Sequence, residues 1–268
     1  MVLTEVQKYL AQEGFHKRTS KEVEDLARAV DPQMMQKVKD LGHATDTYGG
    51  CRAFYENVSQ LVGQTSLYDL FTSRFYDFIE WRLDNLLEVV NEHTRSVADV
   101  CCGTGLEAVF LAERFPNITV SAIDFSPGMI QRTNERVQRR GVTNLRSIVG
   151  NRDELPLLAN SVDLMLCLHA ITEGDRNFYE HSGFAEIYAN QIKVARLSKF
   201  RELISSGGKL VVSYPMLGET SPTYEEYYDD IMLGNLDFAG FSNVVKYAIN
   251  GKDADDTPSR EAFFIATK

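Results

Sequence analysis

The pattern of apolar and polar positions divides the chain into two parts with different periodicities. Across most of residues 1–94, apolar residues recur every three or four positions, as amphipathic helices require. From Ser96 onward, short apolar runs of strand length alternate with helical stretches. Alternation of this kind predicts a parallel sheet with helices on both faces. We therefore expect a helical N-terminal cap over residues 1–94 and an α/β domain over residues 95–268.

The N-terminal part is predicted to contain several helices separated by short breaks. Ser20 is expected to cap one of them, although Val23 three positions later does not complete a capping box. Asp31-Pro32 is expected to begin another helix, because proline suits the first turn. Gly49-Gly50 breaks the helical pattern. The expected helices cover residues 2–12, 20–30, 55–62 and 67–90.

The second part is predicted to alternate strands and helices and to end in two strands. Ser126 and Pro127 favour a helix start, with serine as N-cap and proline at the first helical position. The expected strands cover residues 96–101, 118–123, 145–149, 162–168 and 209–214, and the expected helices cover 106–115, 127–139 and 178–204. The final strands, over 241–250 and 262–267, are expected to be joined by a polar loop over 251–260.

A glycine turn lies between the first of these strands and the helix after it. Gly103 and Gly105 allow a tight turn with positive φ and a close approach of backbone to ligand. The helix that follows would present free N–H groups to that ligand. The next strand ends in Asp124, a carboxylate that can accept hydrogen bonds from two ribose hydroxyls. This unit therefore predicts a site for a nucleotide or nucleoside ligand.

Two ligand classes fit the unit. Gly103, Gly105 and Ala108 match the G-x-G-x-x-A form of the dinucleotide fingerprint, so NAD is one candidate. Asp99, on the strand just before the turn, favours an adenosyl ligand without phosphates. A carboxylate at that place attracts an ammonium group and repels a pyrophosphate.

Five segments in this order resemble motifs of the class I S-adenosylmethionine-dependent methyltransferases. They are Asp99–Gly105 (DVCCGTG), Ala122–Met129 (AIDFSPGM), Gly150–Pro156 (GNRDELP), Ser161–Cys167 (SVDLMLC) and Leu203–Val212 (LISSGGKLVV). The resemblance implies a Rossmann-like α/β fold, with a seven-stranded, mostly parallel sheet into which an antiparallel C-terminal strand is inserted. It also implies S-adenosyl-L-methionine as the cofactor and a small molecule as the methyl acceptor.

The resemblance further implies which residues hold the cofactor. Asp99 and the turn Cys101–Gly105 would hold its methionine end, and Asp124 would hold its ribose. Phe125 and Met129 would flank the adenine. The expected cofactor-binding residues are Asp99, Cys101, Gly103, Gly105, Asp124, Phe125, Met129, Asn151, Arg152 and Leu168.

Asn151 departs from the family pattern, which usually has an aspartate at this position. Its side-chain oxygen can still accept a hydrogen bond from the adenine amine, but without a charge. The backbone N–H of the neighbouring Arg152 is expected to reach a ring nitrogen of the adenine.

Two positions are candidates for a direct part in catalysis. Methyl transfer to an easily deprotonated acceptor needs little acid–base help and can rest on positioning and desolvation. His169 follows the fourth strand and is either a general base, since imidazole titrates near neutrality, or a residue that only lines the pocket. The segment Arg74–Asp77 resembles one that many small-molecule methyltransferases place before the first strand. This resemblance implies that Tyr76, or Tyr68 near it, covers the methionine end of the cofactor; the alternative is a buried structural tyrosine.

Further polar residues are expected on the acceptor side of the pocket. Glu173 and Asp175 either bind a substrate amine or are solvated, and His181 is a candidate for the pocket entrance. An aromatic and acidic segment follows the fifth strand. Its tyrosines either form a lid over an aromatic or cationic molecule or lie on a surface helix. These tyrosines are Tyr224, Tyr227 and Tyr228.

Composition narrows the partners and the setting. The 268 residues carry a formal net charge of −10, which argues against a nucleic-acid backbone or an anionic membrane surface as partner. We find no apolar run of the ~18 residues that a membrane span needs and no signal-peptide pattern at the N-terminus. Four cysteines without metal-ligand spacing favour a reducing, cytoplasmic setting and no metal site. Nothing in the pattern indicates an oligomeric state.

Several alternatives remain at this stage. The fold could belong to a non-catalytic, cofactor-binding regulatory protein, to an enzyme with other chemistry on the same cofactor, to a protein methyltransferase or to a nicotinamide dehydrogenase. An Asn-Pro-Pro-Tyr-like tetrapeptide is absent after the fourth strand, where Cys167-Leu-His-Ala170 stands instead. This lowers the expectation of methylation at the amino nitrogen of a base or of glutamine.

Overall fold

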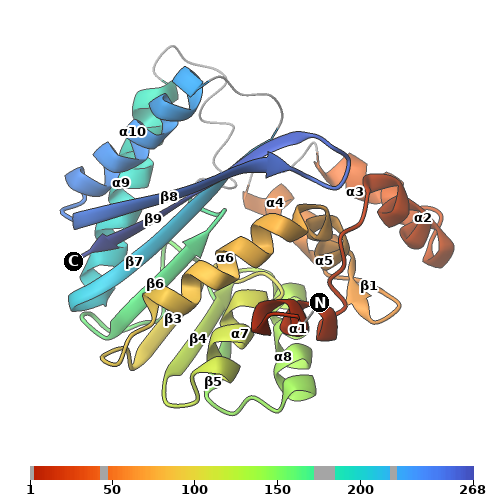
Figure 1. The fold of residues 1–268 in the computed structure, drawn as a ribbon, viewed down its shortest axis with the longest axis horizontal. Helices are drawn as coiled ribbons and strands as arrows, with labels where there is room; N and C mark the ends of the chain where they lie inside the picture. The colour runs from red at the N-terminus through yellow and green to blue at the C-terminus, as the bar shows by residue number, and fades with distance from the viewer. Residues whose placement is uncertain (1–2, 43–47, 172–184, 218–221) are drawn as a thin grey trace.

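A seven-stranded sheet forms the centre of the computed structural model, which describes residues 3–42, 48–171, 185–217 and 222–268 (Figure 1). The strand order is β5-β4-β3-β6-β7-β9-β8, with the first five parallel and the last two antiparallel to their neighbours. The expected fold class is therefore confirmed, including the final strand inserted between two others. The strands are β3 (Ser96–Val100), β4 (Thr119–Asp124), β5 (Leu145–Val149), β6 (Val162–Leu168), β7 (Ile204–Leu217), β8 (Ser242–Lys252) and β9 (Pro258–Thr267).

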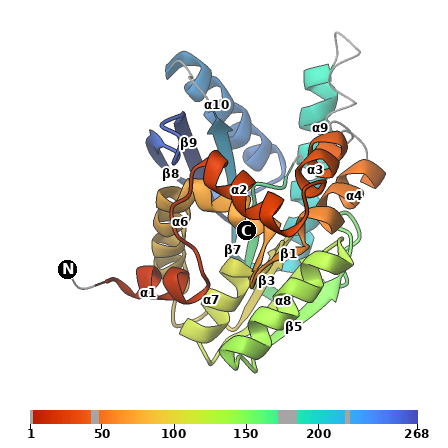
Figure 2. The same ribbon diagram turned by 90° about the vertical axis from the view of Figure 1, so that its right-hand side faces the viewer.

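Helices cover both faces of the sheet, because successive strand residues point to opposite faces and both sets are apolar. One face packs against α1 (Glu5–Gln12), α6 (Tyr76–Val89) and α7 (Leu106–Arg114). The other face packs against α9 (Ala185–Leu203) and α10 (Pro222–Phe238). Figure 2 shows α1 and α6 on one side of the sheet and α9 on the other. A further helix, α8 (Pro127–Arg140), packs against β4 and β5.

A smaller helical layer lies over one end of the sheet. It consists of α2 (Ser20–Val30), α3 (Met34–Gly42), α4 (Tyr48–Val58), the hairpin β1 (Leu61–Val62) and β2 (Thr65–Ser66), α5 (Leu67–Thr72) and the 3₁₀ turn η1 (Ser73–Phe75). This layer has a core of its own, which Met129 of α8 joins. By contrast, α1 and α6 share the main core with the sheet. A boundary at residue 94 thus stays a prediction, since the core is continuous across it.

Several local expectations for the N-terminal part are wrong. Thr19, and not Ser20, caps α2, and it forms a complete capping box with Glu22. Gly49 and Gly50 lie inside α4 and do not interrupt a helix. The helix expected over 55–62 ends at Val58. Gly63, with a φ of 68°, lies in the turn of the β1–β2 hairpin that follows.

Other boundaries shift by a few residues. The helix expected over 67–90 is divided into α5, η1 and α6, and the helix expected at Asp31-Pro32 begins at Met34. The loop expected over 251–260 is shorter, because β8 and β9 extend to Lys252 and from Pro258 as a long hairpin. Figure 1 shows this hairpin reaching past α6 toward α2 and α3. Ser126 caps α8 as expected.

A buried arginine joins the N-terminal helices to the glycine turn. The Nε atom of Arg136 in α8 lies 2.7 Å from Glu13 Oε2, and its Nη2 atom lies 3.0 Å from Asp69 Oδ2. Its Nη1 atom donates to the carbonyl and to the hydroxyl of Thr104, and that hydroxyl donates to Asp69. Burial by itself lowers the pKa of Arg136, but the acids around it raise the pKa above the ordinary value, so the guanidinium stays charged.

We expect Arg136→Met to lower the free energy of unfolding by about 3–5 kcal/mol, because it leaves the buried carboxylate of Asp69 without its cation and removes one of the arginines that pair with Glu13. Urea denaturation of the full chain measures this change. The matched control is Arg114→Met, since Arg114 also bridges to α1, through Glu5, but with both side chains more than half exposed. That control should change stability by less than about 1 kcal/mol, and equal losses in both variants would contradict the prediction.

Candidate active site

The glycine turn between β3 and α7 adopts the conformation that its sequence predicts. Cys101, Gly103 and Gly105 have φ values of 60°, 55° and 74°, in the left-handed region. A Cβ on Gly105 would lie 2.6 Å from Thr133 Cγ2 of α8, so no side chain fits there. A Cβ on Gly103 would have only an ordinary contact with the Tyr68 ring, so the positive φ is what favours glycine at this position. The turn thus brings the start of α7 close to α8 and α5.

Asp99 places a buried carboxylate at the end of β3. The residue is 2% exposed, and its Oδ2 atom has no hydrogen-bond partner among the residues that the structure describes. Burial, followed by the nearby charge of Glu107, raises the pKa of Asp99 well above its ordinary value. A buried carboxylate without a donor is costly, and a ligand that brings an ammonium group would remove that cost.

Asp124 lies at the end of the neighbouring strand β4. Its Oδ2 atom accepts a hydrogen bond of 2.9 Å from the backbone N–H of Gly103, and its Oδ1 atom accepts one of 2.9 Å from Ser126. The carboxylate therefore ties β4 to the glycine turn and to the first turn of α8. Beside it, the ring of Phe125 contacts that of Tyr55 in α4 at a centroid distance of 5.9 Å.

Some of the other expected cofactor residues line the pocket that contains Asp99, and others lie outside it. Cys101 and Leu168 line the same pocket as Asp99. Met129 is fully buried against the core of the helical layer. Asn151 accepts a hydrogen bond of 3.1 Å from the backbone of Asp153, and Arg152 donates to the carbonyl of Ala170.

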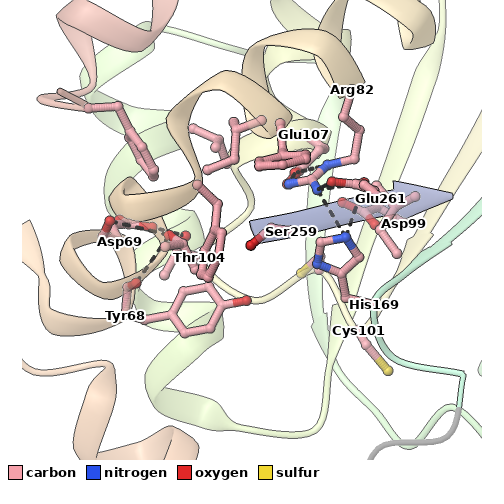
Figure 3. Close-up of a pocket in the computed structure, with 18 of the residues that line it drawn as sticks. Tyr68, Asp69, Arg82, Asp99, Cys101, Thr104, Glu107, His169, Ser259 and Glu261 are labelled. Carbon is pink, nitrogen blue, oxygen red and sulfur yellow. Dashed lines mark hydrogen bonds and ion pairs between the residues drawn. The ribbon is translucent and has the colours of Figure 1, made fainter. Parts of the chain in front are cut away.

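A pocket opens where the ends of β3 and β6 meet α5, α6 and β9 (Figure 3). Asp69, Thr104 and Tyr68 lie on one side of it, and Arg82, Glu261 and His169 on the other. Its lining also includes the apolar side chains Phe15, Phe75, Phe78, Ile79, Leu106 and Leu168. The pocket thus combines an apolar wall with a small number of convergent polar groups, as small-molecule sites do.

One side of the pocket is a chain of charges centred on Arg82 of α6. Its guanidinium pairs with Glu107 of α7 at 2.8 Å and with Glu261 of β9 at 2.9 Å. Burial by itself raises the pKa of Glu261, but the charge of Arg82 and the hydrogen bonds from its guanidinium lower that pKa to about 2. Burial by itself lowers the pKa of Arg82, but the two acids raise it above its ordinary value.

His169 completes this chain at the end of β6. Its Nε2 atom lies 3.0 Å from Glu261 Oε1 and 3.1 Å from Arg82 Nη1. The backbone of His169 has a φ of 58°, and its N–H donates to the carbonyl of Ser213 on β7. The imidazole is therefore held in the pocket from both its backbone and its ring.

The two candidate tyrosines occupy different places. Tyr68 of α5 lines the pocket, next to Gly103. Tyr76 packs against the main core and is not among the residues that line the pocket. Burial, followed by Glu80 and Asp77, raises the pKa of Tyr76. Among the two, Tyr68 is thus the better placed to cover a ligand at the glycine turn.

The expected acceptor-side residues fall partly outside the described structure. Glu173, Asp175 and His181 lie outside the described residues, as does the side chain of Tyr224. Tyr227 and Tyr228 lie on α10 with exposed fractions of 47% and 37%, and neither lines the pocket.

Arg82, Glu107 and Glu261 are among the pocket residues that the sequence did not reveal. One signal pointed to Arg82, because it lies four residues after Phe78 and four before Leu86, on the apolar stripe of α6. A charged residue at such a position needs a buried partner. Glu107 and Glu261 gave no comparable signal, since their partner is 25 and 179 residues away in the chain.

The charges and donors of the pocket fit S-adenosylmethionine. Asp69, Asp99, Glu107 and Glu261 line it, whereas Arg82 and Arg260 are the arginines in the lining. This excess of acids suits a ligand that carries positive charges on an ammonium group and a sulfonium. The carboxylate of Asp99 without a donor is the specific feature that such a ligand would satisfy.

The described part of the chain shows no cluster of three or more potential metal ligands. Among the described helices, none has both the length and the hydropathy that a membrane crossing requires.

Comparisons with known proteins agree with this reading of the pocket. Residues 97–188 match the family model described as "Methyltransferase domain". A demethylmenaquinone methyltransferase of Geobacillus sp. (strain WCH70) is 28% identical over 193 residues, which cover 70% of this chain and 74% of that protein. This relative is consistent with the expectation that the methyl acceptor is a small molecule.

Two solved structures share the fold. Phosphoethanolamine N-methyltransferase 2 of Haemonchus contortus, in complex with S-adenosyl-L-methionine, matches with a TM-score of 0.50 and 15% identity, over 70% of this chain. The match spans about half, 52%, of the length of that structure. A putative methyltransferase of Bacillus halodurans matches with a TM-score of 0.50 and 13% identity, over 69% of this chain and 98% of that one.

These findings do not favour a non-catalytic binding protein, a protein methyltransferase or a nicotinamide dehydrogenase. The family model and the relative both indicate methyl transfer, and the sheet order agrees with the fold of the two solved structures. The chain therefore carries a methyltransferase domain, and it is similar to the class I S-adenosylmethionine-dependent methyltransferases.

Proposed function

We propose that this pocket methylates a small molecule with a flat apolar body and an ionisable hydroxyl group, and that His169 is the general base. The observation that carries the proposal is the position of His169. Its imidazole lies in the same pocket as Asp99, and the lining of that pocket also includes the apolar side chains of Phe75 and Phe78. The relative from Geobacillus is named for demethylmenaquinone. The reduced form of such a quinone, a hydroquinone, is a flat molecule with ionisable hydroxyl groups.

The cofactor, when bound, supplies a methyl group on a sulfonium, so the protein has to bind, orient and deprotonate the acceptor. Asp99 would pair with the ammonium group of the cofactor, because its Oδ2 atom has no donor among the described residues. Asp124 would accept from the ribose, and the Cys101–Gly105 turn would hold the methionine end. Burial of the pocket excludes water and strengthens these charge contacts.

Phe125, Asn151 and Arg152 would surround the adenine, with Met129 supporting them from the core beneath. The ring of Phe125 in its contact with Tyr55, and the place of Asn151 after β5, support this assignment. Leu168, at the end of β6, would lie beside the methionine end, since it lines the pocket.

We also propose a cytoplasmic setting and no nucleic-acid partner. All four cysteines are present as thiols, which suits a reducing compartment. The net charge of −10 opposes binding to a phosphate backbone.

We expect Asp124→Ala to weaken S-adenosylmethionine binding by about 10²-fold, because it removes hydrogen bonds to a charged group that are each worth about 1.5–3 kcal/mol. Isothermal titration calorimetry with S-adenosylmethionine, and with NAD as comparison, measures this. The control is Asp25→Asn on the exposed face of α2, which should bind as the unaltered chain does. Unchanged affinity in Asp124→Ala would contradict the assignment of the cofactor site.

His169→Ala should lower kcat for methyl transfer by about 10²-fold or more, the usual contribution of a general base, with little change in cofactor affinity. Initial rates with reduced demethylmenaquinone, with simple phenols and with amines measure this loss and the acceptor class. Equal kcat in both proteins would show that His169 only lines the pocket. Preference for amines would contradict the proposed acceptor class.

The two tyrosines can be separated by their phenylalanine variants. Tyr68→Phe should raise the KM for cofactor or acceptor by about tenfold, because one hydrogen bond in a buried pocket is lost. Tyr76→Phe should change kcat/KM less than about twofold, since its ring packs on the core. If Tyr76→Phe had a larger effect than Tyr68→Phe, Tyr76 would be the residue that covers the methionine end of the cofactor.

A further inference from the structure

The walls of the pocket come from two sets of segments. Asp99 and Cys101 belong to a segment that resembles a cofactor motif. Phe75 of η1, Phe78 of α6 and residues 259–261 of β9 also line the pocket, but they lie outside all five such segments. The walls from η1, α6 and β9 are therefore the acceptor side of the pocket in the function proposed above.

Arg74 of η1 holds the turn between β8 and β9 through three contacts. Its Nη2 atom donates to Asp253 Oδ2 at 2.5 Å, and its Nε atom lies 3.0 Å from Asp255 Oδ2. The carbonyl of Arg74 accepts a hydrogen bond of 2.9 Å from the N–H of Ala254. Asp253 is only 3% exposed, so its carboxylate needs a partner of opposite charge, and hydrogen bonds between charged groups are stronger than neutral ones.

Asp253 also determines the conformation of this turn. Its Oδ1 atom accepts hydrogen bonds from the N–H groups of Asp255 and Thr257, at 2.9 and 3.0 Å. One carboxylate thus orders the turn with one oxygen and binds Arg74 with the other. The conformation of the turn is therefore coupled to its contact with η1.

The hairpin also contacts the acceptor side farther from the turn. The ring of Phe78 packs on the backbone of β8, since a Cβ on Gly251 would lie 3.3 Å from Cζ of the ring. Gly251 pairs in register with Ser259, which lines the pocket. Still farther along β9, Arg82 of α6 pairs with Glu261 at 2.9 Å. The hairpin therefore lies along η1 and α6, with pocket residues next to each contact.

We propose that Arg74 is a positioning residue, which holds the β8–β9 hairpin on η1 and so sets the separation of the two acceptor walls. The proposal rests on the proposed function, because it needs the acceptor to lie between Phe78 and Ser259. Without the charge pair at the turn, the end of the hairpin would move away from Phe78, and the acceptor would lose one wall. The cofactor side is built on β3 and the glycine turn, which are separate elements, so its affinity should persist.

Hydrogen exchange tests the contact without any acceptor. In Arg74→Met, the amide hydrogens of residues 254–257 should exchange faster by about tenfold or more, because the charged hydrogen bond that holds the turn is lost. The matched control is Ser20→Ala, which removes the 2.6 Å bond from the Ser20 hydroxyl to Asp255 but leaves Arg74 in place. Unchanged exchange in Arg74→Met, or an equal increase in the control, would overturn the proposal.

Kinetics then test whether the contact positions the acceptor. Arg74→Met should lower kcat/KM for reduced demethylmenaquinone by about tenfold to a hundredfold, since a misplacement of about 1 Å can cost as much. Calorimetry of the same variant should show the affinity of the unaltered chain for S-adenosylmethionine. Ser20→Ala should keep both values. An unchanged kcat/KM, or an equal loss of cofactor affinity, would overturn the positioning role.

A double-mutant cycle tests whether Asp253 is the partner through which Arg74 acts. Asp253→Asn keeps an oxygen that can accept from the turn amides, but it presents a neutral amide to Arg74. We expect Asp253→Asn to lower kcat/KM as Arg74→Met does, and the double variant to lose no more than either single variant. Losses that add in the double variant would overturn the proposal.

The two proposals fail in different ways. Hydrogen exchange and cofactor titration contain no acceptor, so they decide whether Arg74 holds the turn even if molecules with hydroxyl groups are not methylated. In that case the proposed acceptor class falls, and kcat/KM is measured with the amine or phenol that is methylated. Thermal unfolding of each variant identifies loss of folding. If Arg74→Met does not fold, Asp253→Asn supports or overturns the proposal by the same measurements.

Discussion

A charge that is buried in a protein has to be compensated there, and this requirement organises the whole pocket. Arg136 and Arg82 are both buried, and each gathers acids from elements far apart in the chain. Arg136 joins the end of α1 and the start of α5 to the glycine turn. Arg82 joins α6 to α7 and β9. The pocket lies between these two clusters, so its walls are set by charge pairing as well as by apolar packing.

The central unit of the fold could be predicted because its signals are local. The alternation of strands and helices after Ser96, the two glycines of the turn and the acid at the end of β4 each lie within a short stretch of sequence. Each signal also has a local physical basis. The alternation reflects the period of apolar residues, the glycines allow a positive φ, and the acid can accept hydrogen bonds. The antiparallel final strands followed from the family resemblance and from two apolar runs.

The pocket walls could not be predicted in the same way, because they depend on long-range contacts. Glu261 is an acid at the start of an apolar strand, and its role appears only when β9 is inserted beside β7. Tyr68 and Tyr76 are eight residues apart on what looked like one helix. The break at η1 places only Tyr68 in the pocket. Gly49 and Gly50 lie in a helix against their propensity, since α4 packs on α3 and α8.

The position of β9 between β7 and β8 has a consequence for how the protein matures. Residues 258–267 leave the ribosome after every other segment that lines the pocket. Until then, Arg82 lacks one of its two carboxylates and the sheet ends at β7 on this side. The nascent chain can therefore form the glycine turn early, but it acquires a complete pocket only when the last strand is threaded between its neighbours.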